Sequence, residues 1–408
     1  MSIRVRVAII ALLIFSFAGG YLLMRRLQVH QAVYDICDLI EEKFYLNSDA
    51  LEQWTNGCRA SAKKLSLFAT RAQIRRLLQD QMDMLHVSHF LIYSPVEDQK
   101  LWKGQAKETG LKTRWMEDHL VVFQIVDGSP AQLAGFRLGD ELVSLNGHEI
   151  QDQEIAVTRS GMYGVLRDGK KLELKVEAGS VQLDSQPSLK RLDDRTALVT
   201  LSSFRSEYFE DEPWKKFVHS WQPYSRLIFD LRENSGGNLV SMLRALSPLF
   251  CHPTVIGNLS LPRRSDGEKQ FLVNDLADDE QINQIDTSSG VILRTFDGYG
   301  CYQGSVAVLI GPHTSSVSEI FSSAILKRPH AKVLGQPTSG DVVLAVWYDL
   351  PTWGPGYSIS IPEALYLTLE GRPLEGEGVF PQKEIFDDLK IWRQGKDSWI
   401  HSALTSGF

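Results

Sequence analysis

From about residue 196 onward, short apolar strands alternate with helical stretches. The expected strands are 196–201, 227–231 and 306–310, and the expected helices are 239–250 and 318–327. Short continuous apolar runs are typical of strands that are buried on both faces. Their alternation with helices is typical of a sheet covered by helices. This part of the chain is therefore predicted to be an α/β domain.

The stretch 94–180 has a different pattern, with short β-like runs separated by turn signals. Ser129 is a good N-cap for a short helix because a proline follows it at the first helical position. Gly135 would end this helix, and Asn146-Gly147 is typical of a tight hairpin turn. The stretch is therefore predicted to form a small, mainly β domain.

Residues 129–147 also resemble the SPAxxAGxxxGDxxxxxNG string of PDZ domains. The resemblance implies a β-barrel-like PDZ domain at 94–180, which would bind extended C-terminal tails of proteins or peptides by adding them to a sheet edge. It also implies that Gly110 and Leu111 lie in the carboxylate-binding loop. A PDZ domain that serves only as a spacer or lid is the alternative.

The first thirty residues resemble an export signal. Arginines precede an apolar run at 7–24, and two more follow it. The run is close to the roughly 20 residues that span a bilayer and longer than the core of a cleavable signal. Residues 1–30 are therefore expected to be a membrane anchor, although cleavage and secretion remain open. Apolar residues at helical spacing predict a helical region at 31–93.

Charge and cysteine content limit the kinds of partner and metal that this chain is expected to bind. The chain has 43 basic and 50 acidic residues, a net charge of −7 and no basic stripe, so nucleic acid is not expected as a partner. Cys37, Cys58, Cys251 and Cys301 lack CxxC spacing, so no metal site is predicted. In an oxidising compartment Cys37–Cys58 and Cys251–Cys301 would be natural disulfides, although three connectivities are allowed and free thiols remain an alternative.

The most chemically suggestive turn leads from the strand 306–310 through Ser316 into a helix. A serine there would lie at the positive end of the helix dipole, and the Val317 N–H would be free to donate to a developing oxyanion. Helix capping alone is the plainer interpretation of these residues.

Residues 314–319 resemble the T-A-S-x-S-E nucleophile motif of the tail-specific (C-terminal processing) serine proteases, and 230–237 resemble their D-L-R-x-N-x-G-G element. The resemblance implies a crotonase-like protease domain at 181–400 with Ser316 as the nucleophile. A backbone N–H of Gly236 or Gly237 would complete the oxyanion hole.

A third element, 335–341, matches the family's G-E-x-T-x-G-K, except that Asp341 stands at the position of the lysine base. A carboxylate that titrates near ~3.9 is a weak base toward a serine hydroxyl. Lys327 and Lys332 are close in sequence but lie on other predicted elements. A serine–lysine dyad is therefore not expected.

Histidine is the natural alternative base. Ser88-His89 resembles the S-H element of the tricorn-like branch of the superfamily, and 374–381 resembles the stretch that supplies its acidic residue, here Glu375. The resemblance implies that Glu375, through Ser88, orients the His89 imidazole. His86 and His313 are the competing candidates for the base.

These residues predict a serine endopeptidase that needs no metal or organic cofactor. By resemblance, it would be anchored in the inner membrane with its body in the periplasm, or secreted if the signal is cleaved, and its oligomeric state is left open. One alternative is an inactive homologue whose PDZ domain binds tails as an adaptor. Another is an acyl-transfer enzyme acting on small esters or peptidoglycan-linked peptides.

Overall fold

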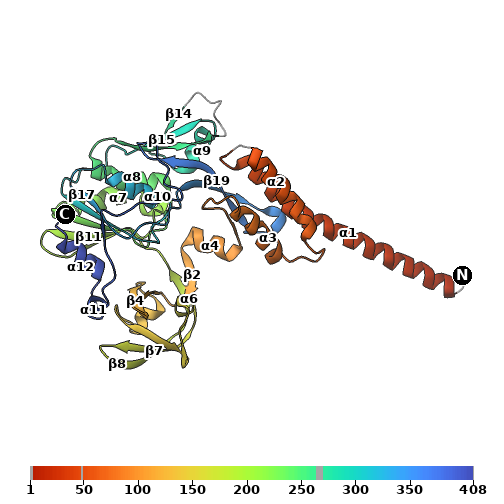
Figure 1. Ribbon diagram of the computed structural model, residues 1–408, viewed down its shortest axis with the longest axis horizontal. Helices are drawn as coiled ribbons and strands as arrows, with labels where there is room; N and C mark the ends of the chain where they lie inside the picture. The colour runs from red at the N-terminus through yellow and green to blue at the C-terminus, as the bar shows by residue number, and fades with distance from the viewer. Residues whose placement is uncertain (1–2, 47–48, 263–269, 408) are drawn as a thin grey trace. The chain divides into compact units, whose positions relative to one another are not determined.

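The computed structural model describes residues 3–46, 49–262 and 270–407 (Figure 1). The chain divides into two compact units. The first comprises Met1–Asp98, Ser260–Glu268 and Val343–Leu365, and the second comprises Gln99–Leu259, Lys269–Val342 and Tyr366–Phe408.

The first unit is mainly helical, as predicted for 31–93. Its helices are α1 (Ile3–Lys43), α2 (Asp49–Ser61), η1 (Ala62–Lys64), α3 (Arg71–Asp83), the first residues of α4 (Pro95–Lys103) and η4 (Pro351–Trp353). Its strands are β1 (Leu91–Tyr93), β18 (Val343–Asp349) and most of β19 (Ser358–Leu367). β19 pairs antiparallel with both β1 and β18, so Leu91 lies opposite Ser360 although they are far apart in sequence.

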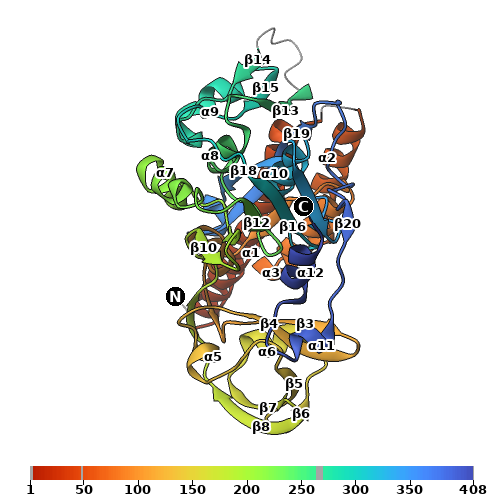
Figure 2. The ribbon, with the colours of Figure 1, turned by 90° about the vertical axis from the view of Figure 1, so that its left-hand side faces the viewer.

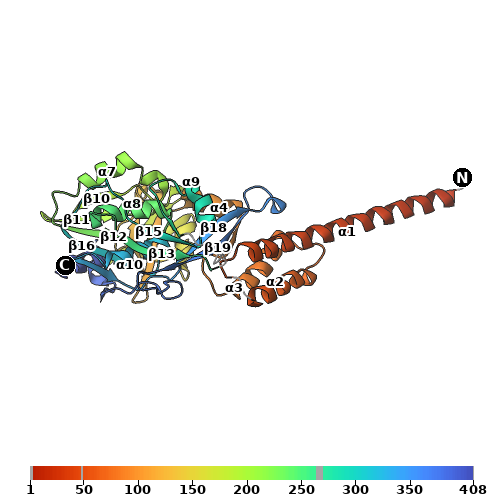
Figure 3. The same cartoon turned by 90° about the horizontal axis from the view of Figure 1, so that it is seen from above.

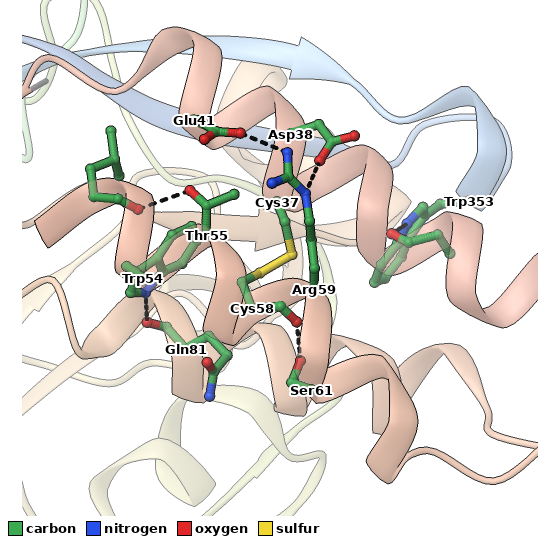
Figure 4. Close-up of a disulfide and its surroundings, with 12 residues drawn as sticks. Cys37, Asp38, Glu41, Trp54, Thr55, Cys58, Arg59, Ser61, Gln81 and Trp353 are labelled. Atoms are coloured by element: carbon green, nitrogen blue, oxygen red, sulfur yellow. Dashed lines mark hydrogen bonds and ion pairs between the residues drawn. A yellow bond between two sulfur atoms is a disulfide. The ribbon is translucent and has the colours of Figure 1, made fainter. Parts of the chain in front are cut away.

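A disulfide joins α1 and α2 inside this unit (Figure 4). Cys37 and Cys58 are both fully buried, and they lie in one apolar cluster with residues of α3, β1 and β19. Beside them Arg59 donates to Asp38 at 2.7 Å and to Glu41 at 2.6 Å. The predicted pairing is confirmed here.

Within the part of the chain that the structure describes, no helix is both long and apolar enough to cross a membrane. The membrane-spanning segment predicted at 1–30 is therefore not confirmed, and residues 1–2 of that segment lie outside the described residues.

Glu97 connects α4 to α3. Arg75 donates to both carboxylate oxygens of Glu97, at 2.7 and 2.9 Å, and the Ser94 N–H and hydroxyl donate to it as well. Burial opposes ionisation, but these hydrogen bonds outweigh it and lower the pKa of Glu97 to about 2.

Glu97→Gln is therefore expected to lower the free energy of unfolding near neutral pH, by less than about 1 kcal/mol because the pair is partly exposed. A carboxyl group whose pKa is lowered in the folded state stabilises the fold fully at pH values above its ordinary pKa of 4.5. This stabilisation is lost as the pH falls toward the folded pKa of about 2. Denaturation of both proteins across this range should show the curves converging in acid. Glu149→Gln, on an exposed strand, is the control, and a gap that persists at acidic pH would contradict the assignment.

The second unit contains a small sheet, called here the β-domain (residues 105–182; Figure 2). Its antiparallel strands follow the order β3-β4-β5-β7-β8, with β6 paired to β5. They are β3 (Leu111–Met116), β4 (His119–Ile125), β5 (Glu141–Leu145), β6 (His148–Glu149), β7 (Gly161–Arg167) and β8 (Lys170–Val176). The domain also holds a two-stranded ribbon of β2 (Gln105–Glu108) and β9 (Gly179–Gln182), and the helices α5 (Pro130–Leu133) and α6 (Gln153–Thr158).

The local signals of this domain act as predicted. The Ser129 side chain accepts from the Gln132 N–H at the start of α5, with Pro130 at the first helical position. Asn146 and Gly147 both have positive φ, as a tight hairpin turn between β5 and β6 requires.

The rest of the second unit is an α/β domain around a six-stranded sheet (Figures 1 and 3). The strands, in sheet order, are β10 (Ser188–Arg191), β11 (Thr196–Thr200), β12 (Arg226–Asp230), β16 (Ser305–Ile310), β17 (Ala331–Gly335) and β20 (Lys383–Glu384). β10 is antiparallel and the others are parallel, so the predicted α/β class is confirmed.

Helices and smaller strands complete this domain. They are η2 (Ser206–Tyr208), α7 (Asp211–His219), α8 (Leu239–Phe250), β13 (Val255–Ser260), β14 (Gln270–Leu272), α9 (Asp278–Asp286), β15 (Gly290–Arg294), α10 (Val317–Ile325), α11 (Leu389–Trp392) and α12 (Ser398–Thr405). The predicted disulfide Cys251–Cys301 is formed just after α8.

The sheet is buried on both faces, as its continuous apolar strands predicted. On one face, Phe229 of β12 contacts Phe321 of α10, with ring centroids 5.9 Å apart. On the other, Ile228 and Leu309 pack in one cluster with Trp399 of α12. The helix predicted at 318–327 corresponds to α10, which begins and ends slightly earlier.

Candidate active site

Three loops meet where parallel strands of the second unit end. They follow β12, β16 and β17, and carboxyl ends of parallel strands share one edge of a sheet. Thr314 donates through its hydroxyl to the Leu231 carbonyl at 2.8 Å, and the Ser315 N–H donates to the Asn234 carbonyl at 3.2 Å. The Ser339 N–H donates to the Thr314 carbonyl at 3.2 Å. The three loops are therefore fixed to one another by hydrogen bonds to main-chain carbonyls.

Ser316 lies at the start of α10 with a positive φ of 61°, a conformation that is strained for a residue with a side chain. The Ser316 N–H lies 2.9 Å from the Asp341 carbonyl and 3.0 Å from Glu319 Oε2, and these contacts hold it in place. Val317 is the first residue of the helix, so its N–H has no acceptor within α10. That N–H and the positive helix end lie immediately beside the serine.

Gly236 and Gly237 form the facing part of the site. A Cβ at Gly236 would lie 2.7 Å from Ser316 Cβ, so only glycine fits against the serine. The Gly236 N–H already donates to Asn234 Oδ1 at 2.9 Å. Gly237 is exposed, and no described residue accepts a hydrogen bond from its N–H. Of the two predicted glycine donors, Gly237 is thus the available one.

Asn234 connects the two sides of this site. Its fully buried side chain accepts from the Gly236 N–H and, at 2.7 Å, from the Ser318 hydroxyl of α10. Its Nδ2 donates to the Leu201 carbonyl at 2.8 Å. The sequence placed Asn234 inside a family motif, but the geometry shows that it fixes the glycine loop against the helix that carries Val317.

Asn234→Asp is expected to slow modification of Ser316 by a fluorophosphonate at least about 10-fold. The new carboxylate oxygen would face the Leu201 carbonyl, which leaves two buried acceptors opposed and costs about 1–3 kcal/mol. The oxyanion donors would then lose their alignment. The rate of labelling and the midpoint of unfolding measure the two effects.

The matched control is Asn238→Asp, which makes the same chemical change four residues later. Asn238 caps α8 by accepting from the Ser241 N–H, a role that aspartate fills equally well. Labelling of Asn234→Asp at the wild-type rate would show that Asn234 does not position the donors.

Glu319 is a buried carboxylate beneath the serine. Besides the Ser316 N–H, it accepts from the N–H groups of Gly340 and Asp341 at 2.9 and 3.0 Å and from the Thr338 hydroxyl at 2.5 Å. Burial raises the pKa of Glu319, although these hydrogen bonds partly offset it. Glu319 therefore holds the third loop against the start of α10.

Asp341 contributes its main chain to this arrangement. Its N–H donates to Glu319, and its carbonyl accepts from the Ser316 N–H. One residue later, the Val342 N–H donates to Glu375 Oε2 at 2.7 Å. Ser316 and Glu375 thus contact two consecutive residues of the third loop, Asp341 and Val342, so the predicted acid lies against the loop that holds the Ser316 N–H.

Ser88 and His89 belong to the first unit. The Ser88 hydroxyl and His89 Nδ1 are 2.9 Å apart, and His89 has a positive φ of 57°. The Ser360 hydroxyl of β19 donates to the His89 carbonyl, which fixes this turn against the strand. Of the competing bases, His86 is exposed in the first unit and His313 is exposed in the second.

Gly110 and Leu111, the residues predicted to bind a ligand carboxylate, lie where the chain enters β3. Both are buried, and β3 ends the strand order of the β-domain sheet.

A strained serine at a helix N-terminus, facing a glycine loop at the edge of an α/β sheet, is the arrangement expected of a serine hydrolase. Residues 195–385 match the model described as peptidase family S41. The match covers a little less than half of the chain, and together with the relatives described below it confirms the predicted relationship to the tail-specific proteases.

Known proteins resemble this chain over much of its length. A probable CtpA-like serine protease of Staphylococcus aureus (strain COL) is 21% identical over 285 residues, which cover 68% of this chain and 52% of the relative. The chain thus spans about half the length of that relative.

Solved structures share the fold. A photosystem II D1 C-terminal processing protease has a TM-score of 0.53 at 17% identity, covering 90% of this chain and 94% of that one. Mature CPAF complexed with lactacystin has a TM-score of 0.60 at 14% identity, covering 93% of this chain and 98% of that one.

Proposed function

We propose that this chain is a serine endopeptidase with Ser316 as its nucleophile. The observation that carries the proposal is the strained turn at Ser316, which packs against Gly236 at the start of α10. The N–H groups of Val317 and Gly237 are assigned as the oxyanion donors. The serine oxygen would attack the scissile carbonyl, and the acyl-enzyme would then be released by water.

His89 is assigned as the general base. For Nε2 to accept the Ser316 proton, Nδ1 must carry the other hydrogen and donate it to Ser88, which lies 2.9 Å away. The Ser88 hydroxyl could then donate to a carboxylate, and we assign this role to Glu375. His89 would pass the proton to the leaving amine. The presence of Asp341 where the family has lysine favours this histidine-based mechanism over a serine–lysine dyad.

The β-domain is assigned a PDZ-like role in gathering extended polypeptide onto the edge of β3 with which no described strand pairs. Exported proteins are the proposed substrates. Two disulfides support this assignment because such bonds persist in oxidising compartments.

The competing function is that of an inactive homologue that binds polypeptide as an adaptor, and Asp341 motivates it. Incubation of the purified protein with unfolded casein separates the two. Fragments that accumulate with time support the peptidase. Intact casein, together with a Ser316 that no fluorophosphonate labels, would overturn it in favour of the adaptor.

A further inference from the structure

The direction of the Gly237 N–H is set by a residue outside the glycine loop, Phe204. The Phe204 N–H donates to the Gly236 carbonyl at 2.9 Å, and the Phe204 carbonyl accepts from the Asn238 N–H at 2.8 Å. The Gly236 carbonyl and the Gly237 N–H belong to one planar trans peptide, so they point in opposite directions. Because this carbonyl faces Phe204, the Gly237 N–H faces away from it.

Gly237 also lies directly against the Phe204 main chain. The two residues form an isolated parallel bridge, and a Cβ at Gly237 would lie 2.7 Å from the Phe204 carbonyl carbon. The φ of Gly237 is 137°, a conformation that side-chain-bearing residues rarely adopt. Each of the two peptide planes that flank Gly237 is held by one hydrogen bond to Phe204. The loop therefore cannot rotate at Gly237 without breaking a contact with Phe204.

The Phe204 ring reaches the other side of the site. It is fully buried, and its centroid lies 5.9 Å from that of Phe321 in α10 and 5.5 Å from that of Phe209. α10 is the helix that begins with Val317. Phe204 thus contacts the glycine loop through its main chain and the helix that follows Ser316 through its ring.

Arg205 anchors this residue to the rest of the second unit. Its guanidinium donates to the Leu101 carbonyl at 2.7 Å and to the Trp102 carbonyl, and it forms an ion pair with Asp184. Leu101 and Trp102 lie in the last turn of α4, whose carbonyls have no partner within the helix. The side chains of Arg205 and Asp184 are only 13% and 11% exposed, so solvent screens their attraction weakly.

From these contacts we propose that Arg205 is a positioning residue for the reaction at Ser316. Held on α4 and Asp184, it keeps Phe204 against Gly236 and Asn238. The Gly237 N–H then stays turned away from Phe204, free to serve as an oxyanion donor. That this donor serves catalysis rests on the proposed function, whereas the fixing of the loop does not.

The test is the rate at which a fluorophosphonate modifies Ser316 in the full chain carrying Arg205→Gln. Loss of one oxyanion donor costs about 10²–10³-fold in rate, and misdirecting one should cost less. We therefore expect labelling to be about 10-fold slower, with the same number of labels per chain at completion. Chains that had simply unfolded would lower that number instead. A rate within about 2-fold of wild type would overturn the proposal.

Tyr208→Phe is the matched control. The Tyr208 hydroxyl donates to Asp184 at 2.9 Å, so its loss weakens the same cluster without removing the residue next to Phe204. It should be labelled at close to the wild-type rate, and equal slowing in both variants would overturn the specific role of Arg205. Arg205→Lys keeps the charge but lacks the planar fork, so it should be intermediate and give a folded protein if Arg205→Gln does not.

Hydrogen exchange of the Asn238 amide tests the loop independently of catalysis. Because its acceptor is the Phe204 carbonyl, this amide should exchange several-fold faster in Arg205→Gln and at the wild-type rate in Tyr208→Phe. Unchanged exchange in Arg205→Gln would refute the fixing of the loop by Arg205. A wild type that no fluorophosphonate labels, with exchange altered as expected, would refute the proposed function and leave the role of Arg205 in the loop standing.

Discussion

Ser316→Ala is expected to reduce cleavage of unfolded casein by at least about 10³-fold, because no acyl-enzyme can form without the hydroxyl. The residual rate would reflect only binding and the oxyanion donors of Val317 and Gly237. The Ser316 hydroxyl projects from a backbone that Asp341 and Glu319 hold through the N–H, so alanine should leave the turn intact. Initial rates of fragment release measure the loss.

Ser315→Ala is the matched control for this prediction. Ser315 is the adjacent serine, and its N–H donates to the Asn234 carbonyl, a main-chain hydrogen bond that alanine retains. It should therefore cleave casein at close to the wild-type rate. Equal loss in both variants would indicate a damaged turn, and full activity of Ser316→Ala would exclude it as the nucleophile.

The assignment of the base is tested in the same assay. His89→Ala is expected to lose activity about as completely as Ser316→Ala, because members of a triad act as a unit. Asp341→Asn should keep most activity, since the residue contributes its main chain to the site. If activity survives replacement of His89 but is lost on replacement of His313, the general base is His313, in the loop beside the serine.

Arg232→Met is expected to lower the free energy of unfolding by about 3–5 kcal/mol, the usual cost of removing one partner from a buried ion pair. Arg232 donates to Asp230 at 2.7 and 2.8 Å and to Asp397 at 2.6 and 3.1 Å. Without it, two carboxylates would remain poorly compensated between the end of β12 and the start of α12. Chemical denaturation monitored by tryptophan fluorescence would measure the change.

The pH dependence gives this prediction a second readout. Burial opposes ionisation of Asp230, but the charge of Arg232 outweighs it and lowers the pKa of Asp230 from 3.8. The stability from this pair is therefore complete above pH 3.8 and is lost as the pH falls through the lower folded value. The gap between wild type and Arg232→Met should narrow in acid.

Two further variants serve as controls for the effect of Arg232→Met on stability. Arg191→Ala, which removes an exposed ion pair with Asp194, should change stability by less than about 1 kcal/mol. Arg232→Lys retains the charge but not the planar fork, so it should be intermediate and give a folded protein if Arg232→Met does not. A loss for Arg232→Met no larger than for Arg191→Ala would contradict the structural role of the pair.

Several features could be predicted from the sequence because they depend only on residues that are neighbours in the chain. Ser129 with its following proline fixes a helix start, and Asn146-Gly147 supplies the positive φ of a hairpin turn. Continuous apolar runs such as 306–310 identify strands that are covered on both faces. The order of three motifs was enough to indicate the family, since each motif is local.

The contacts that make the site depend on residues distant in sequence. Nothing near Glu319 indicates that it would accept from the N–H groups of Gly340 and Asp341, or that the Gly236 N–H would be taken by Asn234. Leu91 pairs with Ser360 only because β19 lies between β1 and β18.

The sequence by itself therefore determined the strands, caps and turns of this protein and, through the family motif, its candidate nucleophile. Only the tertiary structure decided which cysteines pair, which N–H groups remain available beside Ser316, and which carboxylate holds the third loop. The physical reason is that propensity and motif report on a few adjacent residues, whereas the availability of a hydrogen-bond donor depends on which distant acceptor reaches it first.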